Sequence, residues 1–251
     1  MSRRAWVAHI MGMPVSIHLR GAGVDSPVVA EAVQDAFDLL READRLFSTY
    51  RKDSQVARIR AGELEPAHAG PLVAQVVALC RQAGDLTDGA FTDQLPDEHG
   101  VRRFDPTGLV KGWAADRAAG RLADLPGLAF CLNVGGDVVV GAAQAEGDQQ
   151  RTNGASGAPW RVGIEDPRDR SRVAQVVQLH AGGVATSGTA ARGAHLYDPI
   201  AQTFTGRPGS VTVVGPNLMW ADVWATALFV GPAALRDRFA EVAGNYAMIS
   251  L

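Results

Sequence analysis

Between Leu218 and Val230 the chain reads LMWADVWATALFV, and only Asp222 and Thr226 carry side-chain oxygen in this run. On a helix, residues four apart lie on one face, one turn above the other. A carboxylate in so apolar a segment is costly to bury unless its charge is compensated. A hard divalent cation such as Mg²⁺, which binds carboxylate, hydroxyl and carbonyl oxygens, would compensate it. The alternative, which this segment leaves open, is that both side chains bond to neighbouring loops.

The segment itself predicts a helix. Asn217 is a good N-cap, and Gly231 and Pro232 supply a stop signal. A helix of this length rises about 20 Å, which is too short to cross a bilayer core of about 30 Å. We therefore expect a buried helix that presents two oxygen atoms, not a membrane span.

A second candidate site is the segment 105–113, which reads DPTGLVKGW. Gly108 and Gly112 allow the backbone to approach a ligand closely, and a helix start offers N–H groups to anions. Lys111 could reach a phosphate from here, although the spacing differs from the Walker pattern. The alternative is an ordinary glycine-rich helix start.

Two further polar segments interrupt apolar runs. The segment 133–137, NVGGD, is typical of a hairpin turn or bulge, because glycine pairs adopt such turns readily. Thr186-Ser187-Gly188 follows a predicted strand and offers hydroxyl and N–H groups that suit a phosphate. An ST turn explains the same residues.

A histidine near a turn is the remaining candidate. His195 precedes the turn at Asp198-Pro199, and a histidine there can act as a general base near neutral pH. A structural histidine at a strand end is the alternative. The sequence has no Gly-x-Ser-x-Gly elbow, no His-Glu-x-x-His and no cysteine cluster, which excludes the commoner hydrolase and zinc classes.

Hydrophobic periodicity predicts the elements that position these residues. A hairpin is expected over 5–11 and 14–20, with His18 on its solvated face. Helices are expected over 27–46, 54–60, 71–83, 109–123, 218–230 and 232–243, and strands over 128–133, 137–141, 160–165, 173–180, 210–214 and at the C-terminus. Segments 87–100 and 141–158 are expected to be loops. This mixed order favours an α+β fold, and because no repeat or linker divides it, we expect one domain over 1–251.

The composition excludes some classes of partner. Of the 251 residues, 47% are hydrophobic, and the net charge is −3 with no basic block, so nothing indicates nucleic acid binding. Cys80 and Cys131 both lie in apolar segments, which predicts buried free thiols and fits a reducing compartment.

Taken together and in order, these segments resemble the FAD:protein FMN transferases, the family also called ApbE or thiamine biosynthesis lipoprotein. The resemblance is carried by MGMPVSIHL, FSTYRKDSQVARI, TDGAF, DPTGLVKGWAADRA, LNVGGDVVV, WRVGIEDP, ATSG, HLYDP and VTVVGPNLMWADVWATALFV. No single segment decides it, but their order along nearly the whole chain is specific to this family.

The resemblance implies an ApbE-like fold of mostly antiparallel sheets flanked by helices, in two closely associated lobes with the FAD site in the cleft between them. It implies an Mg²⁺-dependent transferase of phosphorus-containing groups that cleaves FAD, attaches FMN through a phosphoester to a Thr or Ser of an acceptor protein, and releases AMP. An FAD pyrophosphatase, in which water replaces the acceptor hydroxyl, and a non-catalytic FAD carrier are the alternatives. Asp222, Thr226 and His195 together favour an enzyme over a carrier.

The resemblance also implies the roles of individual residues. Asp222, Thr226 and the main-chain carbonyl of Val110 match the family's Mg²⁺ ligands. His195 matches the histidine proposed to activate the acceptor hydroxyl, and we expect Lys111 and Asp222 to act with it in catalysis. The residues expected to contact FAD are Met11, Tyr50, Ala90, Phe91, Thr107, Trp113, Asp116, Ser187 and Tyr197.

The first residues, MSRRAWVAHIMGM, contain no sustained apolar region and no small-residue cleavage site, which predicts no signal peptide. We therefore expect a cytoplasmic protein, or one whose leader has been removed, because family members are often exported and anchored to a membrane.

Overall fold

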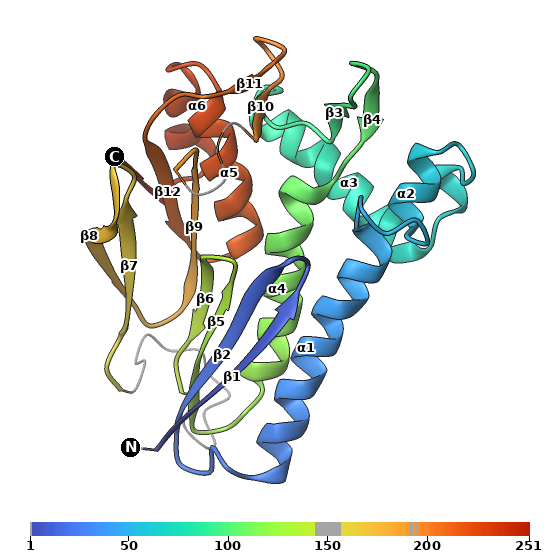
Figure 1. Cartoon of the computed structure of the whole chain (residues 1–251). Coiled ribbons are helices and arrows are strands. Elements are labelled where there is room, and N and C mark those ends of the chain that lie inside the picture. Colours follow the sequence, from blue (N-terminus) through green and yellow to red (C-terminus); the bar gives the residue numbers. More distant parts are fainter. Residues whose placement is uncertain (1, 144–156, 191–192, 194) are drawn as a thin grey trace.

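A seven-stranded sheet forms one layer of the molecule (Figure 1). The computed structural model describes residues 2–143, 157–190, 193 and 195–251. Neighbouring strands of this sheet pair antiparallel throughout, in the order β1-β2-β5-β6-β9-β12-β13. The strands are β1 (Arg3–Ile10), β2 (Met13–Gly21), β5 (Leu128–Val134), β6 (Asp137–Gly141), β9 (Gly182–Gly188), β12 (Ser210–Gly215) and β13 (Ala247–Ser250).

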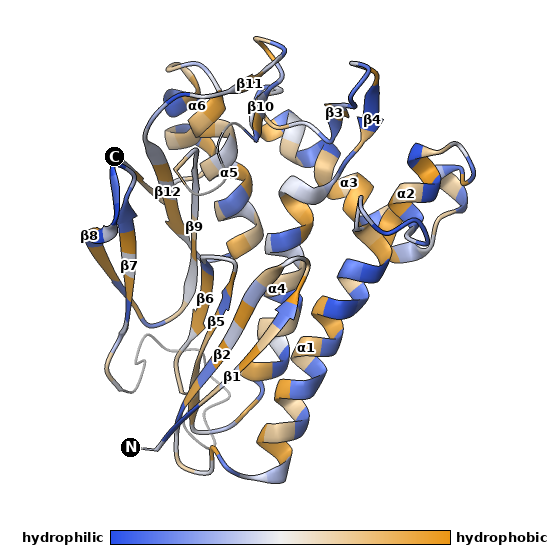
Figure 2. Cartoon of the chain, in the orientation of Figure 1, coloured by the Kyte–Doolittle hydropathy of each residue, from blue (hydrophilic) through white to orange (hydrophobic). Residues whose placement is uncertain are grey.

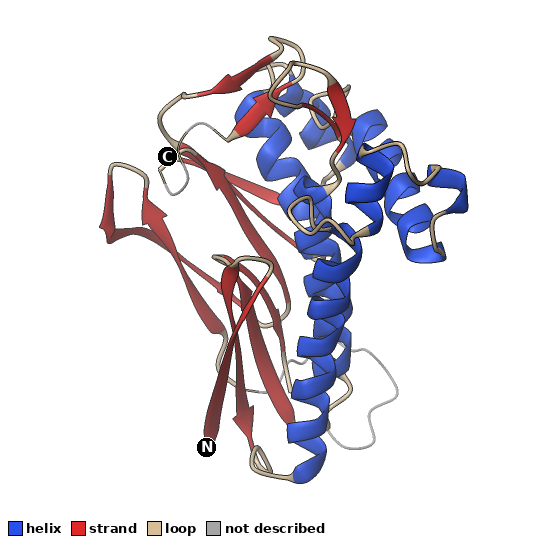
Figure 3. Ribbon diagram, turned by 45° about the vertical axis from the view of Figure 1, so that its right-hand side comes forward, coloured by secondary structure: helices blue, strands red, loops and turns tan. Residues whose placement is uncertain are grey.

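Helices cover one side of this sheet (Figure 3). The long helix α1 (Pro27–Phe47) packs on α4 (Thr107–Ala123), and α4 packs in turn on α5 (Leu218–Val230). Both α4 and α5 contact the sheet, α4 through β5 and β6 and α5 through β6, β9 and β12. The shorter helices are α2 (Gln55–Arg60), α3 (Pro71–Leu86), α6 (Leu235–Val242) and a 3₁₀ turn, η1 (Pro66–His68).

Three two-stranded hairpins complete the described fold. They are β3 (Gln94–Pro96) with β4 (Arg102–Phe104), β7 (Trp160–Asp166) with β8 (Asp169–Leu179), and β10 (Leu196–Asp198) with β11 (Thr203–Thr205). In the last of these hairpins, β10 also contacts α5. The fold is therefore α+β with antiparallel sheets flanked by helices, as the sequence predicted.

The hydrophobic core lies between the sheet and the helices. Strand β2 shows the predicted alternation, with Val15, Ile17 and Leu19 buried and His18 exposed. Apolar residues line the facing sides of α1, α4 and the sheet, whereas α5 is apolar over most of its circumference (Figure 2). Helix α5 is buried on nearly all sides because it packs between α4 and the sheet.

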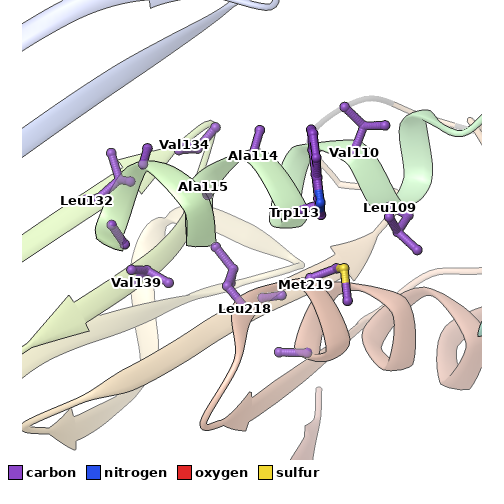
Figure 4. Close-up of a cluster of buried hydrophobic side chains, with 14 of the residues drawn as sticks. Leu109, Val110, Trp113, Ala114, Ala115, Leu132, Val134, Val139, Leu218 and Met219 are labelled. Carbon is purple, nitrogen blue, oxygen red and sulfur yellow. The ribbon is translucent and has the colours of Figure 1, made fainter. Parts of the chain in front are cut away.

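Helices α4 and α5 approach closely at a glycine. A Cβ atom built on Gly112 would lie 2.6 Å from Cα of Met219, so only glycine fits here. Figure 4 shows Met219 and Leu218 at the start of α5, directly against α4. The sequence left open whether Gly112 admits a ligand or belongs to an ordinary glycine-rich helix start. The structure supports the second interpretation, because the backbone of α5 occupies that space.

Most predicted elements are confirmed, and several segments differ. The predicted loop 87–100 contains β3, whose partner β4 was not predicted either; the strand β9 was not predicted, and the hairpin β10–β11 was missed. The predicted loop 141–158 lies mostly outside the described residues. In the described part of the chain no helix is both long and apolar enough to cross a membrane.

Both cysteines are free thiols, as predicted. Cys80 is buried in α3, and burial raises the pKa of its thiol. Cys131 on β5 is half-buried, and burial raises the pKa of its thiol to about 11. Both side chains therefore stay protonated near neutral pH and are poor nucleophiles.

Candidate functional site

Helix α5 begins at a well-defined cap. The side chain of Asn217 accepts a hydrogen bond from the N–H of Trp220 at 3.1 Å. The carboxylate of Asp116, on α4, accepts two more, from the N–H of Leu218 at 3.1 Å and from that of Met219 at 2.8 Å. These bonds satisfy N–H groups that have no partner inside the helix. They also fix α5, and with it Asp222, relative to α4.

Asp222 is buried within the second turn of α5, with 3% of its surface exposed. The charge that compensates it comes from α4, because Nζ of Lys111 lies 3.5 Å from Oδ2 of Asp222. The same ammonium group forms a shorter ion pair with Oδ2 of Asp137, at the start of β6. Lys111 thus joins two buried carboxylates that are remote in sequence.

Asp137 is held rigidly by the turn that precedes it. Gly135 and Gly136 both have positive φ, at 62° and 107°, and Oδ1 of Asn133 accepts the N–H of Gly136 at 2.9 Å. Oδ1 of Asp137 accepts the N–H of Thr186 on β9 at 3.0 Å. The sequence correctly predicted the hairpin turn but missed Asp137 as a site residue. The signal was a carboxylate placed directly after a tight turn in an apolar strand pair.

A second link joins α5 to the sheet beside Asp222. The hydroxyls of Ser187 on β9 and Thr226 on α5 lie 2.9 Å apart. Ser187 is buried, and Thr226 is half-buried. The structure therefore brings four predicted site residues to one place, the junction of α4, α5 and the sheet: Lys111, Ser187, Asp222 and Thr226.

The donor set at this junction suits a hard cation. Two carboxylates and two hydroxyls converge on it, and Val110 directly precedes Lys111 on α4. Oxygen ligands of this kind fit Mg²⁺ or Ca²⁺ better than softer metals. Among the described residues no three His, Cys, Asp or Glu side chains form a metal-binding group. A cation here would accordingly need hydroxyl or main-chain oxygens in addition to carboxylate.

The residues predicted to contact the flavin differ widely in exposure. Ala90 and Phe91 are buried where the end of α3 meets the start of α4, and Phe91 lies against Gly108. Trp113 is buried edge-on against Phe47 of α1, with their ring centres 5.4 Å apart.

Three other predicted flavin contacts lie in a loop, at a helix start and in a strand. Tyr50, just after α1, has 95% of its surface exposed, and Thr107 at the start of α4 is also exposed. Thr107 donates its hydroxyl to Oδ1 of Asp105 at 2.5 Å. Tyr197 on β10 is buried against Phe204 of β11, with ring centres 5.3 Å apart.

Met11 lies in the β1–β2 turn with a left-handed φ of 53°. This turn is at the same end of the sheet as the β5–β6 turn that carries Asp137, and both lie beside α4 (Figure 1). The two turns are also linked directly, because the N–H of Gly135 donates to the carbonyl of Pro14 at 3.1 Å. Met11 thus belongs to the end of the sheet that lies next to the carboxylates of Asp137 and Asp222.

Asp116 has an unusual electrostatic environment. Burial raises the pKa of its carboxyl to about 6, and the hydrogen bonds from Met219 and Leu218 oppose that rise without cancelling it. Both carboxylate oxygens already serve the backbone of α5. In the described contacts, Asp116 therefore supplements the Asn217 cap of α5.

His195 lies in an exposed segment just before β10, which packs on α5. Its Nδ1 lies 2.9 Å from the carbonyl oxygen of Gly193. Because a carbonyl only accepts, a neutral ring in this geometry carries its proton on Nδ1 and leaves Nε2 as the acceptor. A proton acceptor is what the predicted general base requires.

Comparison with known proteins finds relatives over most of the chain. The family model of the ApbE family matches residues 11–95 and 92–249. The FAD:protein FMN transferase of Escherichia coli strain K12 is 27% identical over 86% of this chain and 75% of its own length. The protein of that name from Salmonella typhimurium is 29% identical over 83% of this chain and 73% of its own. The solved structure of the flavin transferase ApbE from Vibrio cholerae superposes with a TM-score of 0.77 at 21% identity, and it covers 99% of this chain and 93% of that one.

Proposed function

The chain belongs to the ApbE family, and we propose that it is an enzyme that cleaves FAD and transfers FMN to a hydroxyl of an acceptor protein. The observation that supports this most is the family match from residue 11 to 249, with relatives named FAD:protein FMN transferase. The carboxylate and hydroxyl oxygens at the junction of α4, α5 and β9 are consistent with it. We also infer that the chain forms one domain.

Asp222, Thr226 and the main-chain carbonyl of Val110 would hold Mg²⁺, which when bound neutralises charge on a pyrophosphate. Lys111 adds an ammonium group at the same place and favours departure of the AMP phosphate. Met11, Ala90, Phe91, Thr107, Trp113, Ser187 and Tyr197 remain the proposed flavin-binding positions, together with Tyr50 and Asp116.

The proposed reaction is a phosphoryl transfer. The acceptor hydroxyl oxygen bonds to the FMN phosphorus, and the bond between that phosphorus and the bridging oxygen breaks, so that AMP leaves with the electron pair. Nε2 of His195 takes the proton of the acceptor hydroxyl. Because His195 lies in an exposed segment, an acceptor protein can reach it without entering the core.

The test is to incubate the purified protein with FAD and Mg²⁺, alone and with an array of Thr- and Ser-containing peptides. Matched peptides with Val or Ala in place of the hydroxyl residue are the control. We expect AMP release together with a peptide mass increased by one FMN less one water. AMP and FMN formed equally without any peptide would indicate a pyrophosphatase instead. FAD that stays bound and intact would indicate a carrier.

A further inference from the structure

Lys111 contacts two buried carboxylates that come from different parts of the fold. Its Nζ pairs with Oδ2 of Asp137 and lies 3.5 Å from Oδ2 of Asp222. The side chains of Asp137 and Asp222 are only 4% and 5% exposed, against 22% for Lys111. Among the described residues, these two carboxylates and this ammonium together carry one unit of negative charge. Since such charge is costly to bury, the cluster favours the arrival of more positive charge.

The two ion pairs are not equivalent. Asp137 is fixed by its turn and by the N–H of Thr186, and its contact with Lys111 is the shorter one. The contact with Asp222 is longer. An ammonium group is a compact charge on a flexible stem, so it can leave one carboxylate while it stays on the other. The geometry identifies Asp222 as the carboxylate that is released and Asp137 as the one that retains Lys111.

We propose that Lys111 is the internal counter-ion of Asp222 in the absence of a divalent cation. We also propose that Asp137 is a positioning residue that retains the ammonium group when a divalent cation binds Asp222. This inference rests on the proposed function, in which Asp222 is a ligand of Mg²⁺. With both cations present the cluster carries a net positive charge, which suits the negatively charged pyrophosphate of FAD.

The inference predicts how removal of Lys111 changes metal binding. Lys111→Met removes the competing ammonium and keeps most of the stem, so Mg²⁺ should bind Asp222 about tenfold more tightly or better. Isothermal titration of the FAD-free protein with Mg²⁺ alone measures this. The chain has only one other lysine, the exposed Lys52, and Lys52→Met is the matched control, which should leave the affinity unchanged. Lys111→Gln, which keeps an N–H donor for the carboxylates, replaces the Met variant if that variant does not fold.

Asp137 is tested by a double-variant cycle with Lys111. In the wild-type background, Asp137→Asn leaves Asp222 as the carboxylate partner of Lys111, so the ammonium competes more strongly and Mg²⁺ affinity falls. In the Lys111→Met background, the same Asp137→Asn change should lower the affinity much less. A residue that only supports the fold would weaken binding by the same factor in both backgrounds.

Three results would overturn the inference. They are an unchanged or weaker Mg²⁺ affinity after loss of the ammonium, an equal effect of Asp137→Asn in both backgrounds, and no Mg²⁺ binding by either wild type or the Lys111 variants. These failures are separate from failure of the proposed function, because the titrations contain no FAD. FMN transfer together with unchanged Mg²⁺ affinities in the variants would contradict the inference alone. The expected Mg²⁺ affinities without FMN transfer or FAD cleavage would contradict the proposed function alone.

Discussion

The hydroxyl of Ser187 on β9 lies 2.9 Å from the hydroxyl of Thr226 on α5, and this bond ties the face of α5 that carries Asp222 to the sheet. Thr226→Val keeps the volume and removes the bond, and it leaves the buried Ser187 hydroxyl without this partner. We expect a loss of about 1–3 kcal/mol in the free energy of unfolding, measured by urea denaturation. If Thr226 is also a metal ligand, FAD cleavage falls as well.

The control for this change is Thr212→Val. Thr212 on β12 is buried, and its hydroxyl lies 2.8 Å from that of Thr186, so the same substitution breaks a similar hydroxyl pair. We expect a similar loss of stability with FAD cleavage retained. Full cleavage activity in the Thr226 variant would contradict a ligand role for its hydroxyl.

Asp222→Asn should abolish most FAD cleavage. The amide is nearly isosteric but lacks the charge that a divalent cation needs, and metal catalysis of this kind contributes several kcal/mol to the barrier. We expect AMP release to fall about 100-fold or more, measured by chromatography at saturating FAD. Asp124→Asn, at the exposed end of α4, makes the same change away from the cluster and should have no effect. A wild-type rate of FAD cleavage in the Asp222 variant would show that Asp222 is not a residue of the active site.

His195→Gln should impair transfer to a peptide more than the affinity for FAD. General-base catalysis contributes about 100-fold or more, and Gln has no group that takes up the proton at this position. Initial rates of peptide modification give the size of the loss, and a fluorescence titration with FAD gives the affinity. His18→Gln, at an exposed position on β2, is the control and should behave as wild type. Equal transfer rates in both variants would show that another group accepts the proton.

Gly112→Ala should destabilise the packing of α4 on α5. The added Cβ would lie 2.6 Å from Cα of Met219, so the two helices must move apart, at a cost of about 1–3 kcal/mol. Gly120→Ala on the same helix meets nothing within 4 Å and should instead stabilise it by up to about 1 kcal/mol. Thermal denaturation of both variants checks the pair. A stabilised Gly112→Ala variant would mean that helix propensity, not close approach, governs this position.

Asp116 should make stability depend on pH. Because burial raises its pKa to about 6 from 3.8, the folded chain keeps this proton over a range where the unfolded chain has lost it. The contribution of Asp116 to stability is therefore greatest in acid, is lost as the pH rises towards 6, and is constant above that. Asp116→Asn lacks this titration.

Denaturation of wild type and of Asp116→Asn at about pH 4.5 and pH 7.5 measures the effect, because other carboxyls titrate alike in both proteins. The wild type should lose stability relative to the variant at the higher pH. A pH-independent cost is also expected, because an amide oxygen replaces only one of the two acceptors for the N–H groups of Leu218 and Met219. A difference that stays constant with pH would contradict the raised pKa.

The local patterns of the sequence determined most of the helices and strands, and they placed two of the candidate site residues, Asp222 and Thr226. Asn217, the apolar run and Gly231 define α5 without help from the rest of the chain, and helical periodicity places Asp222 and Thr226 on one face. Strict alternation in β2 identified the hairpin β1–β2. Such signals are readable because they depend on neighbours three or four positions away at most.

Only the tertiary structure decided what meets these residues. The sequence of β9, GGVATSG, has little intrinsic preference for a strand, and it becomes one because β6 and β12 pair with it on both sides. That pairing carries Ser187 to Thr226 and the N–H of Thr186 to Asp137. Lys111 meets Asp137 and Asp222 only because α4, β6 and α5 converge. Contacts between residues so remote in sequence depend on how whole elements pack, which local periodicity does not specify.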